Sequence, residues 1–358
     1  LGGGAILNLK DNRNIGVVQL RNVTSNVTGT INVQESYTGK MVLVPYNNVY
    51  TIGLQLVTFA EGTAESANNI TVRKYASKTV YNDDSYCVDT NGTLQYTLNA
   101  VKVGDETYTT LSEAVAAVGS SEETTIYVLR DVDVCETIVL GSAEAEKNII
   151  ITNAPAVDAK LVRTSGVSMF KVVSGSILTV GSEDTTNKLI LDGGYVEGIE
   201  TSLTGSVPMV DNEGGFTLRE NATMQNACST TNGGALYNRK GTANLYGNMI
   251  GNRAKQGGAI ANTGSVIIHG GIYADNVSTG GAGGVIYSAT TGNKVTVNDG
   301  SFYENTAEKQ TGGVIYCNGT LTITGGIYYN NKAETGGGVV SAAGNNPTIT
   351  KVLMYNNS

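Results

Sequence analysis

Acidic side chains are the first candidates for chemistry in the repetitive second half of this chain. Only five occur between residues 233 and 358, namely Asp275, Asp299, Glu304, Glu308 and Glu334. Asp275 and Glu304 each directly precede an asparagine of the repeat described below, so stacked repeats would bring the two carboxyls to about 5 Å. Such a pair could hold a cation or share a proton, as in polysaccharide-cleaving enzymes. The alternative is a solvated turn in which Asn330 continues the column.

The other reactive groups form no catalytic or metal-binding motif. His269 is the single histidine, and it alternates with Ile267 in "VIIHGG", which is typical of a surface strand. A catalytic triad or a histidine-rich metal site would have to be built around that one residue. "STGGAGGV" lacks the GK[ST] of a phosphate-binding loop, and "DNEGG" lacks the calcium-loop pattern. We therefore expect no catalytic residue, no metal and no cofactor.

Composition narrows the functional classes. The 358 residues include 46 Gly but only 4 Pro, and 15% of them are charged. The 40% hydrophobic share is too high for a disordered chain, and no run of about 18 apolar residues predicts a membrane span. A net charge of −8 without a basic block argues against nucleic acid as a partner. We expect no nucleic acid and no membrane insertion in this segment.

Four cysteines stand far apart and include no CxxC pair, so zinc and thioredoxin chemistry lack their signature. We expect them to be buried small residues, with one disulfide between two of them as the alternative. They are Cys87, Cys135, Cys228 and Cys317.

Glycine pairs open five near-identical blocks in residues 233–358. The blocks begin "GGALYN", "GGAIAN", "GGVIYS", "GGVIYC" and "GGVVSA", at spacings of 24, 26, 29 and 25 residues. A branched aliphatic residue follows three positions after the first glycine, and with the chain start included this aliphatic column is Ile6, Leu236, Ile260, Ile286, Ile315 and Val340. Most blocks place an asparagine nineteen positions after the first glycine, and the predicted asparagine column is Asn22, Asn226, Asn252, Asn276, Asn305, Asn331 and Asn356. In each of the five blocks a large apolar residue lies three positions before the asparagine. These residues are Met249, Tyr273, Phe302, Tyr328 and Leu353.

Segments between these landmarks alternate with period two, as in "SVIIHG", "KVTVNDG" and "TLTITGG". This pattern predicts short strands, about three to a block. Such a block buries its apolar face only by stacking on a copy of itself, each strand pairing in parallel with its equivalent. We therefore predict an all-β fold, a right-handed parallel β-helix with about 25 residues per coil. Its stacked asparagines would exchange amide hydrogen bonds from coil to coil.

Three regions follow from these patterns. Residues 1–65 are predicted to be terminal coils that complete a β-helix begun by the preceding unit, and residues 66–108 to be a strand-rich connector. Residues 109–358 are predicted to be a β-helix with an N-terminal cap helix near 111–118, continued by residue 1 of the next unit. Ser112 would cap that helix, with Leu111, Val115 and Val118 on one side. The helix would cover the open end of a new solenoid.

The first residues of the chain continue the pattern of its last residues. When "LGGGAILN" is written after "MYNNS", Gly3 lies 24 positions after Gly337, and Asn8 falls in the column of Asn238 and Asn262. One residue departs from the pattern, because Gln19 occupies the position that is aromatic in Tyr273 and Phe302. We expect identical units to continue one another, either in one tandem array or as subunits stacked head to tail. The predicted unit-to-unit seam is Leu1, Gly2, Gly3, Gly4, Ala5, Ile6, Met354, Tyr355, Asn356, Asn357 and Ser358.

The order "YTTLSEAVAAV", "TIYVLRDV", "SGSILTVGS", "LILDGG" and then "GGALYN…LYGNMIGN" resembles the large repetitive surface proteins of Gram-positive anaerobes, which carry pectate-lyase-like β-helices in tandem. GGA[IL] followed by an aromatic-x-x-Asn also resembles the passenger repeats of chlamydial polymorphic outer membrane proteins. The likeness covers most of residues 105–358 and, across the seam, about 1–60. It implies secretion, display at the bacterial cell surface, and an adhesive or scaffolding role without a single ligand.

These patterns favour a non-enzymatic extracellular structural repeat unit of a bacterial surface filament, fibre or stalk, whose partners are identical units. The first alternative is an adhesin that binds surface glycans or a host surface. The second alternative is a polysaccharide lyase or hydrolase. An adhesin could use an exposed aromatic face, but lateral packing or half-buried strand faces are the favoured explanation of the same rings. The tyrosines concerned are Tyr237, Tyr246, Tyr287, Tyr303, Tyr316 and Tyr329.

Overall fold

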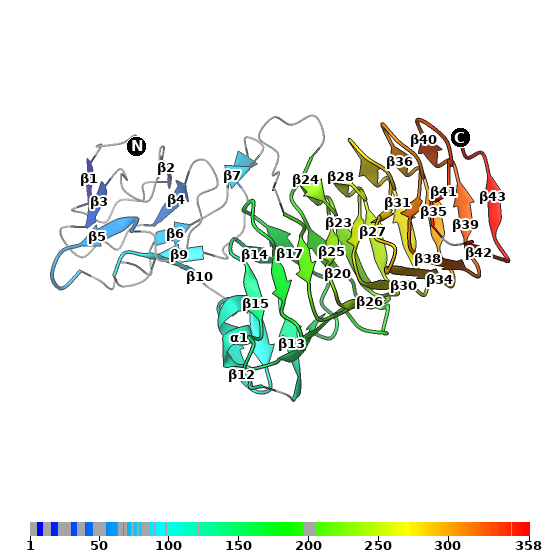
Figure 1. The fold of residues 1–358 in the computed structure, drawn as a ribbon. Helices are drawn as coiled ribbons and strands as arrows, with labels where there is room; N and C mark the ends of the chain where they lie inside the picture. Colours follow the sequence, from blue (N-terminus) through cyan, green and yellow to red (C-terminus); the bar gives the residue numbers. More distant parts are fainter. Residues whose placement is uncertain are drawn as a thin grey trace. The chain divides into compact units, whose positions relative to one another are not determined.

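The computed structural model divides the chain into two compact units, Leu1–Asn99 and Ala100–Ser358 (Figure 1). The structure describes residues 99–358 except 121, 197–204, 206 and 345. Before residue 99 it describes 6–9, 16–20, 30–33, 40–45, 55–63, 67, 70–72, 75–76, 79–80, 86–88 and 91–96. The prediction of an all-β parallel β-helix is confirmed, with about 26 residues per turn.

The first unit contains two sheets whose early strands are parallel. One sheet consists of β1 (Ile6–Leu9), β3 (Thr30–Val33) and β5 (Val57–Phe59). The other runs through parallel β2 (Gly16–Leu20), β4 (Met41–Pro45) and β6 (Ile70–Val72) to antiparallel β9 (Tyr86–Val88) and β10 (Leu94–Tyr96). A separate antiparallel pair joins β7 (Tyr75–Ala76) and β8 (Thr79–Val80). The unit is therefore a short coil stack that changes to antiparallel pairing.

The second unit is a longer stack, and Figure 1 shows its strands one behind another from β14 to β43. Among the described residues its largest sheet has 11 strands. In spatial order these are β12 (Glu106–Tyr108), β11 (Val101–Val103), β13 (Glu123–Val128), β16 (Asn148–Asn153), β19 (Ile177–Val180), β22 (Gly215–Leu218), β26 (Thr242–Leu245), β30 (Ser265–Ile268), β34 (Lys294–Val297), β38 (Thr320–Ile323) and β42 (Thr348–Ile349).

Two further sheets complete the wall of each coil, with 9 and 8 strands in the described chain. The nine-stranded sheet is β14 (Val132–Val134), β17 (Ala159–Arg163), β20 (Leu189–Asp192), β23 (Ala222–Gln225), β27 (Asn248–Ile250), β31 (Ile272–Ala274), β35 (Ser301–Tyr303), β39 (Ile327–Tyr329) and β43 (Leu353–Tyr355). The eight-stranded sheet is β15 (Ile138–Leu140), β18 (Phe170–Val172), β21 (Val210–Asn212), β25 (Leu236–Asn238), β29 (Ile260–Asn262), β33 (Ile286–Ser288), β37 (Ile315–Cys317) and β41 (Val340–Ala342).

Later coils add a fourth short strand that the sequence pattern did not predict. These strands are β24 (Cys228–Asn232), β28 (Arg253–Gln256), β32 (Val277–Ser278), β36 (Thr306–Ala307) and β40 (Lys332–Ala333). β24 and β28 end directly before the glycine pair of a block, and three or four residues separate each of the other three strands from its glycine pair. Gly257 adopts a left-handed φ of 62°, and a Cβ on Gly258 would lie 2.3 Å from the carbonyl oxygen of Gly284 in the next coil. The pair thus allows a sharp corner and close coil contact.

One end of the second unit is closed by a hairpin and a helix. β11 pairs antiparallel with both β12 and β13, which ends the parallel stacking. The predicted helix is present as α1 (Leu111–Ala117), the single helix of the described chain, and no described helix is long and apolar enough to cross a membrane. The hairpin belongs to this unit, although the sequence pattern had assigned residues 101–108 to the connector.

The predicted N-cap of α1 was wrong. Thr110 caps the helix, and its side chain accepts from the backbone N–H of Glu113 while the Glu113 carboxylate accepts from the N–H of Thr110. This reciprocal box needs a carboxylate three residues after the cap, and Ser112 has Val115 there. Leu111, Val115 and Val118 are buried in the solenoid core as expected.

Side chains inside the second unit form continuous columns, because parallel pairing in register places equivalent residues above one another. One inward column of the nine-stranded sheet runs from Met249 through Tyr273, Phe302 and Tyr328 to Met354. The Tyr273 and Phe302 ring centroids lie 4.9 Å apart, and those of Phe302 and Tyr328 lie 4.7 Å apart. Leu353 was expected here, but its place in the column is taken by Met354.

Tyr273 provides a test of this core. Its ring is fully buried, burial raises the pKa of its phenol, and its hydroxyl has no hydrogen-bond partner in the described structure. An unsatisfied buried hydroxyl costs about 1–3 kcal/mol. Tyr273→Phe keeps the ring stack, so we expect it to raise the free energy of unfolding by about 1 kcal/mol in urea titrations.

Tyr328→Phe is the matched control, because the Tyr328 hydroxyl donates to the carbonyl of Gly325 at 3.4 Å. It should give a smaller gain or a loss. A Tyr273→Phe protein less stable than Tyr328→Phe would contradict the described packing.

Candidate functional site

A buried asparagine ladder runs along the solenoid axis. The amide nitrogen of each asparagine donates to the amide oxygen of the next coil, from Asn252 to Asn276 at 3.0 Å and from Asn276 to Asn305 at 3.0 Å. The ladder continues from Asn305 to Asn331 at 2.9 Å and from Asn331 to Asn357 at 2.9 Å. All donors point the same way along the axis.

Each rung of the ladder also satisfies backbone groups. The Asn305 amide oxygen accepts the backbone N–H of Asn276 at 3.1 Å, and its amide nitrogen donates to the carbonyl of Tyr273 at 2.8 Å. The side chains of Asn252, Asn276, Asn305 and Asn331 are fully buried. Buried amides are tolerated only when their hydrogen bonds are made, so the ladder holds the corners of adjacent coils together.

Two predicted members of the asparagine column, Asn226 and Asn356, were placed wrongly by one residue. Asn357 accepts from Asn331, and the oxygen of Asn252 accepts from the backbone N–H of Ala227. The coil that ends at Asn357 is longer because Cys317 pairs with Ala342, 25 residues on, whereas Ile323 pairs with Ile349, 26 residues on. The turn after β41 therefore holds one extra residue, and every later position of this coil is shifted by one residue relative to the preceding coils. Asn22 lies outside the described residues.

Asn226 and Asn356 belong instead to a left-handed corner that precedes the ladder. Its members have φ between 53° and 63°, and they are Asn226, Gly251, Asp275, Glu304, Asn330 and Asn356. Asn, Asp and Gly tolerate this conformation best, which explains the residue types. The predicted solvated turn, with Asn330 continuing the column, is what the structure shows.

Asp275 and Glu304 lie on adjacent coils of this corner. Partial burial raises the pKa of the Asp275 carboxyl, and the charge of Glu304 and a hydrogen bond with it raise it further. Within the described residues no three potential metal ligands gather, here or elsewhere. The pair is an exposed corner contact.

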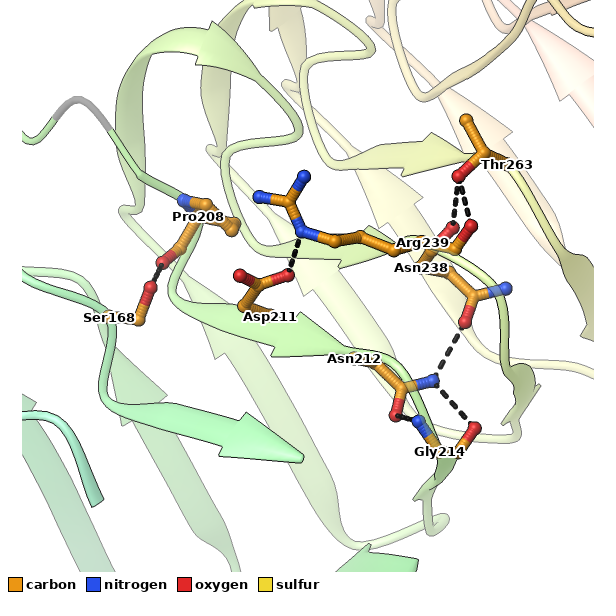
Figure 2. A network of polar contacts seen from close by, with 8 residues as sticks. All are labelled: Ser168, Pro208, Asp211, Asn212, Gly214, Asn238, Arg239 and Thr263. Atoms are coloured by element: carbon orange, nitrogen blue, oxygen red, sulfur yellow. Dashed lines mark hydrogen bonds and ion pairs between the residues drawn. The ribbon is translucent and has the colours of Figure 1, made fainter. Parts of the chain in front are cut away.

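A second polar column lies at the end of the eight-stranded sheet. Figure 2 shows the amide of Asn212 directed at Asn238, with a donor–acceptor distance of 2.7 Å. Asn238 donates to Asn262 at 2.9 Å, and Asn262 donates to the hydroxyl of Ser288 at 3.2 Å. Beside it, Arg239 pairs with Asp211 of the preceding coil (Figure 2). These contacts again join coil to coil.

The predicted aliphatic column is present in the second unit. Leu236, Ile260, Ile286, Ile315 and Val340 pair successively in register, and all but Val340 are fully buried. Ile6 lies in β1 of the first unit, where Leu7 and Leu9 pack against the core. Asn8 is exposed on the face opposite Leu7 and Leu9, unlike the buried Asn238 and Asn262. The side chain of Ile6 lies outside the described residues, so its place in this column stays a prediction.

Tyrosine rings on the surface stack on neighbouring rings or cations. The centroids of Tyr303 and Tyr329 lie 4.9 Å apart, and those of Tyr329 and Tyr355 lie 5.2 Å apart. Tyr287 stacks on Tyr316 at 5.4 Å. Arg239 covers Tyr237, and His269 lies parallel to Tyr246 at 4.2 Å. Lateral packing therefore occupies ring faces that a sugar would need.

The remaining candidate groups form no reactive centre. Burial lowers the pKa of His269, which contacts Tyr246, Asn244 and Asn298. Cys228 and Cys317 are buried and free, as expected. Cys135 is free but exposed at the end of β14, so its predicted burial was wrong, and the side chain of Cys87 lies outside the description.

The last described coil presents an open edge, formed by Val340, Ile349, Met354, Tyr355 and Asn357. These residues end the aliphatic, aromatic and asparagine columns, and they line a shallow hollow of about 450 Å³. Ile349 is 37% exposed and Met354 40% exposed, whereas Ile323 and Tyr328 one coil below are fully buried. Of the predicted seam, Met354 to Ser358 lie here, and Leu1, Gly2, Gly3, Gly4 and Ala5 lie outside the described residues.

Comparison with protein-family models, with curated proteins and with solved structures found no match. The functional argument therefore depends on the geometry of the columns and the open edge.

The ladder predicts a large cost for losing one amide in its middle. Asn305→Ala removes the acceptor of two Asn276 donors and the donor to Tyr273 and Asn331. Unpaired buried groups cost about 1–3 kcal/mol each, so we expect a loss of about 3 kcal/mol or more in urea unfolding. Asn357→Ala breaks similar bonds at the half-buried end and should cost less; equal losses would contradict the role of burial.

The Asp275–Glu304 contact predicts a pH dependence. A carboxyl whose pKa is raised on folding favours the folded state below its ordinary pKa, near 3.8, and loses that contribution as pH rises through the folded-state pKa. Unfolding measured from about pH 3 to pH 7 should show a smaller decline for Glu304→Gln than for the unchanged protein. Glu334→Gln, at an exposed acid, should leave the decline unaltered. Identical profiles for all three proteins would refute this contact.

Proposed function

We propose that this protein is a non-enzymatic structural unit of a bacterial surface filament, fibre or stalk, which continues from unit to unit by stacking of β-helical coils. The observation that carries the proposal is the open edge. The aliphatic column, the aromatic column and the asparagine ladder reach it without a closing strand or helix among the described residues. An exposed parallel edge is a template for further pairing.

The asymmetry of the second unit supports directional growth. Its other end is closed by β11, β12 and α1, and Lys147 ties the helix to the coil by donating to the carbonyls of Val115 and Val118. Because that end offers no parallel edge, the open edge is continued by a different part of the neighbouring unit, and the contact between units is heterologous. The neighbouring unit lies either farther along one polypeptide or in another copy, and the stacking is the same in both cases.

The extracellular location is part of the same proposal. It is supported by the resemblance to bacterial surface repeat proteins and by a composition in which only 15% of residues are charged. Adhesion through surface tyrosines finds less support, because their ring faces are covered. Catalysis finds less support, because the exposed Asp275–Glu304 pair stands without a third ligand among the described residues.

Sedimentation velocity and negative-stain microscopy of the purified chain test the proposal. We expect single-file oligomers that lengthen with concentration. Burying a methionine side chain is worth about 1.5–3 kcal/mol, so Met354→Lys should weaken association about tenfold or more. Ile177→Lys is the matched control, because Ile177 is equally exposed, at 41%, on the flank of the solenoid. A 37.3 kDa monomer at every concentration would overturn the proposal.

A further inference from the structure

The two units carry opposite patterns of strand pairing. The second unit starts with antiparallel β11 and ends with parallel β41, β42 and β43 at the edges of their sheets. The first unit starts with parallel β1 and β2 at the edges of their sheets and ends with antiparallel β9 and β10. Each unit thus has one closed end and one parallel edge.

The first unit also has the coil lengths of the second. β1 and β3 are offset by 24 residues, β2 and β4 by 25, β3 and β5 by 26, and β4 and β6 by 29. These offsets equal the spacings of the glycine-pair blocks, which are 24, 26, 29 and 25. Asn32 donates to Asn8 at 3.2 Å, an exposed amide contact between coils whose donor points to the preceding coil, opposite to the ladder of the second unit. The coils therefore share one repeat.

The apolar side chains at the two parallel edges are complementary. Leu7 and Val18 pack against the core of the first unit but remain only partly buried. Val18 pairs with Leu43, which is fully buried, so Val18 belongs to the inward face of its sheet. Met354 holds the corresponding inward place at the open edge of the second unit.

We propose that residues 100–358 of one unit and the first 99 residues of the following unit form one β-helix, in which β2 stacks in parallel on β43 and Val18 covers Met354. The inference rests on the proposed function, and it adds the partner segment and the contact. The physical domain is then offset from the unit of sequence. It begins at the closed end with α1 and ends at the antiparallel strands β9 and β10.

A mixing experiment tests the Val18–Met354 contact. Met354→Lys and Val18→Glu chains should each assemble poorly alone, and an equimolar mixture should form long oligomers. The mixture alternates unchanged contacts with contacts between the introduced lysine and glutamate. A mixture of Met354→Lys with Val18→Lys is the matched control, and it should stop at dimers. Long oligomers in the control, or none in the first mixture, would overturn the contact.

A circular permutant tests the offset domain independently of those variants. It joins Ser358 to Leu1 and opens the chain between Asn99 and Ala100, which keeps every residue. We expect a monomer with one cooperative unfolding transition, against two transitions for the original chain when it is dilute. Two transitions in the permutant would overturn the inference even where the original chain assembles. An original chain that stays monomeric beside a permutant with one transition would overturn only the proposed function.

Discussion

Parallel hydrogen bonding between successive coils, kept in register, determines where nearly every side chain of the second unit lies. It converts a repeat in the sequence into columns in space, so a residue type that suits one coil meets its own copy about 4.8 Å away. Aliphatic and aromatic side chains gain burial from this arrangement, and asparagine gains a partner for a buried amide. A single buried Asn305 without Asn276 and Asn331 would carry unpaired donors and acceptors. The columns therefore stabilise the structure only collectively.

The same constraint limits which side chains meet one another in the described part of the chain. Each column places residues of the same type next to one another. The described surface therefore shows tyrosine stacked on tyrosine and a corner pair of carboxyls, and not a cluster of different polar side chains. The chemistry of the columns is directed along the axis. Each amide of the ladder donates toward the coil that follows, so the two ends of the solenoid differ in hydrogen-bonding character as well as in closure. This directionality suits growth of a fibre better than binding of a small molecule.

The fold could be predicted from the sequence because period and residue type agree at every coil. The glycine pairs, the alternation and the asparagines at 252, 276, 305 and 331 all indicate the same stack. The errors came from single-residue changes in turns. One extra residue after Ala342 moves the ladder position from Asn356 to Asn357. Asn226 was assigned to the ladder from its distance to the next glycine pair, although the ladder position of that coil is residue 227. Sequence alternation alone could not place Val18 on the inward face of β2, because a strand slip of one residue exchanges the two faces. The cap at Thr110 was missed because Glu113 completes it from outside the apolar pattern.

The unequal coil lengths also matter for how such a protein changes over generations. The turn between β33 and β34 spans residues 289–293, whereas the turn between β29 and β30 spans only 263–264. Yet β33 and β34 keep their pairing with the coils on either side. Insertions at such corners project outward and leave the columns undisturbed. A protein built in this way can therefore change the length and sequence of its corner loops while its axial frame stays constant.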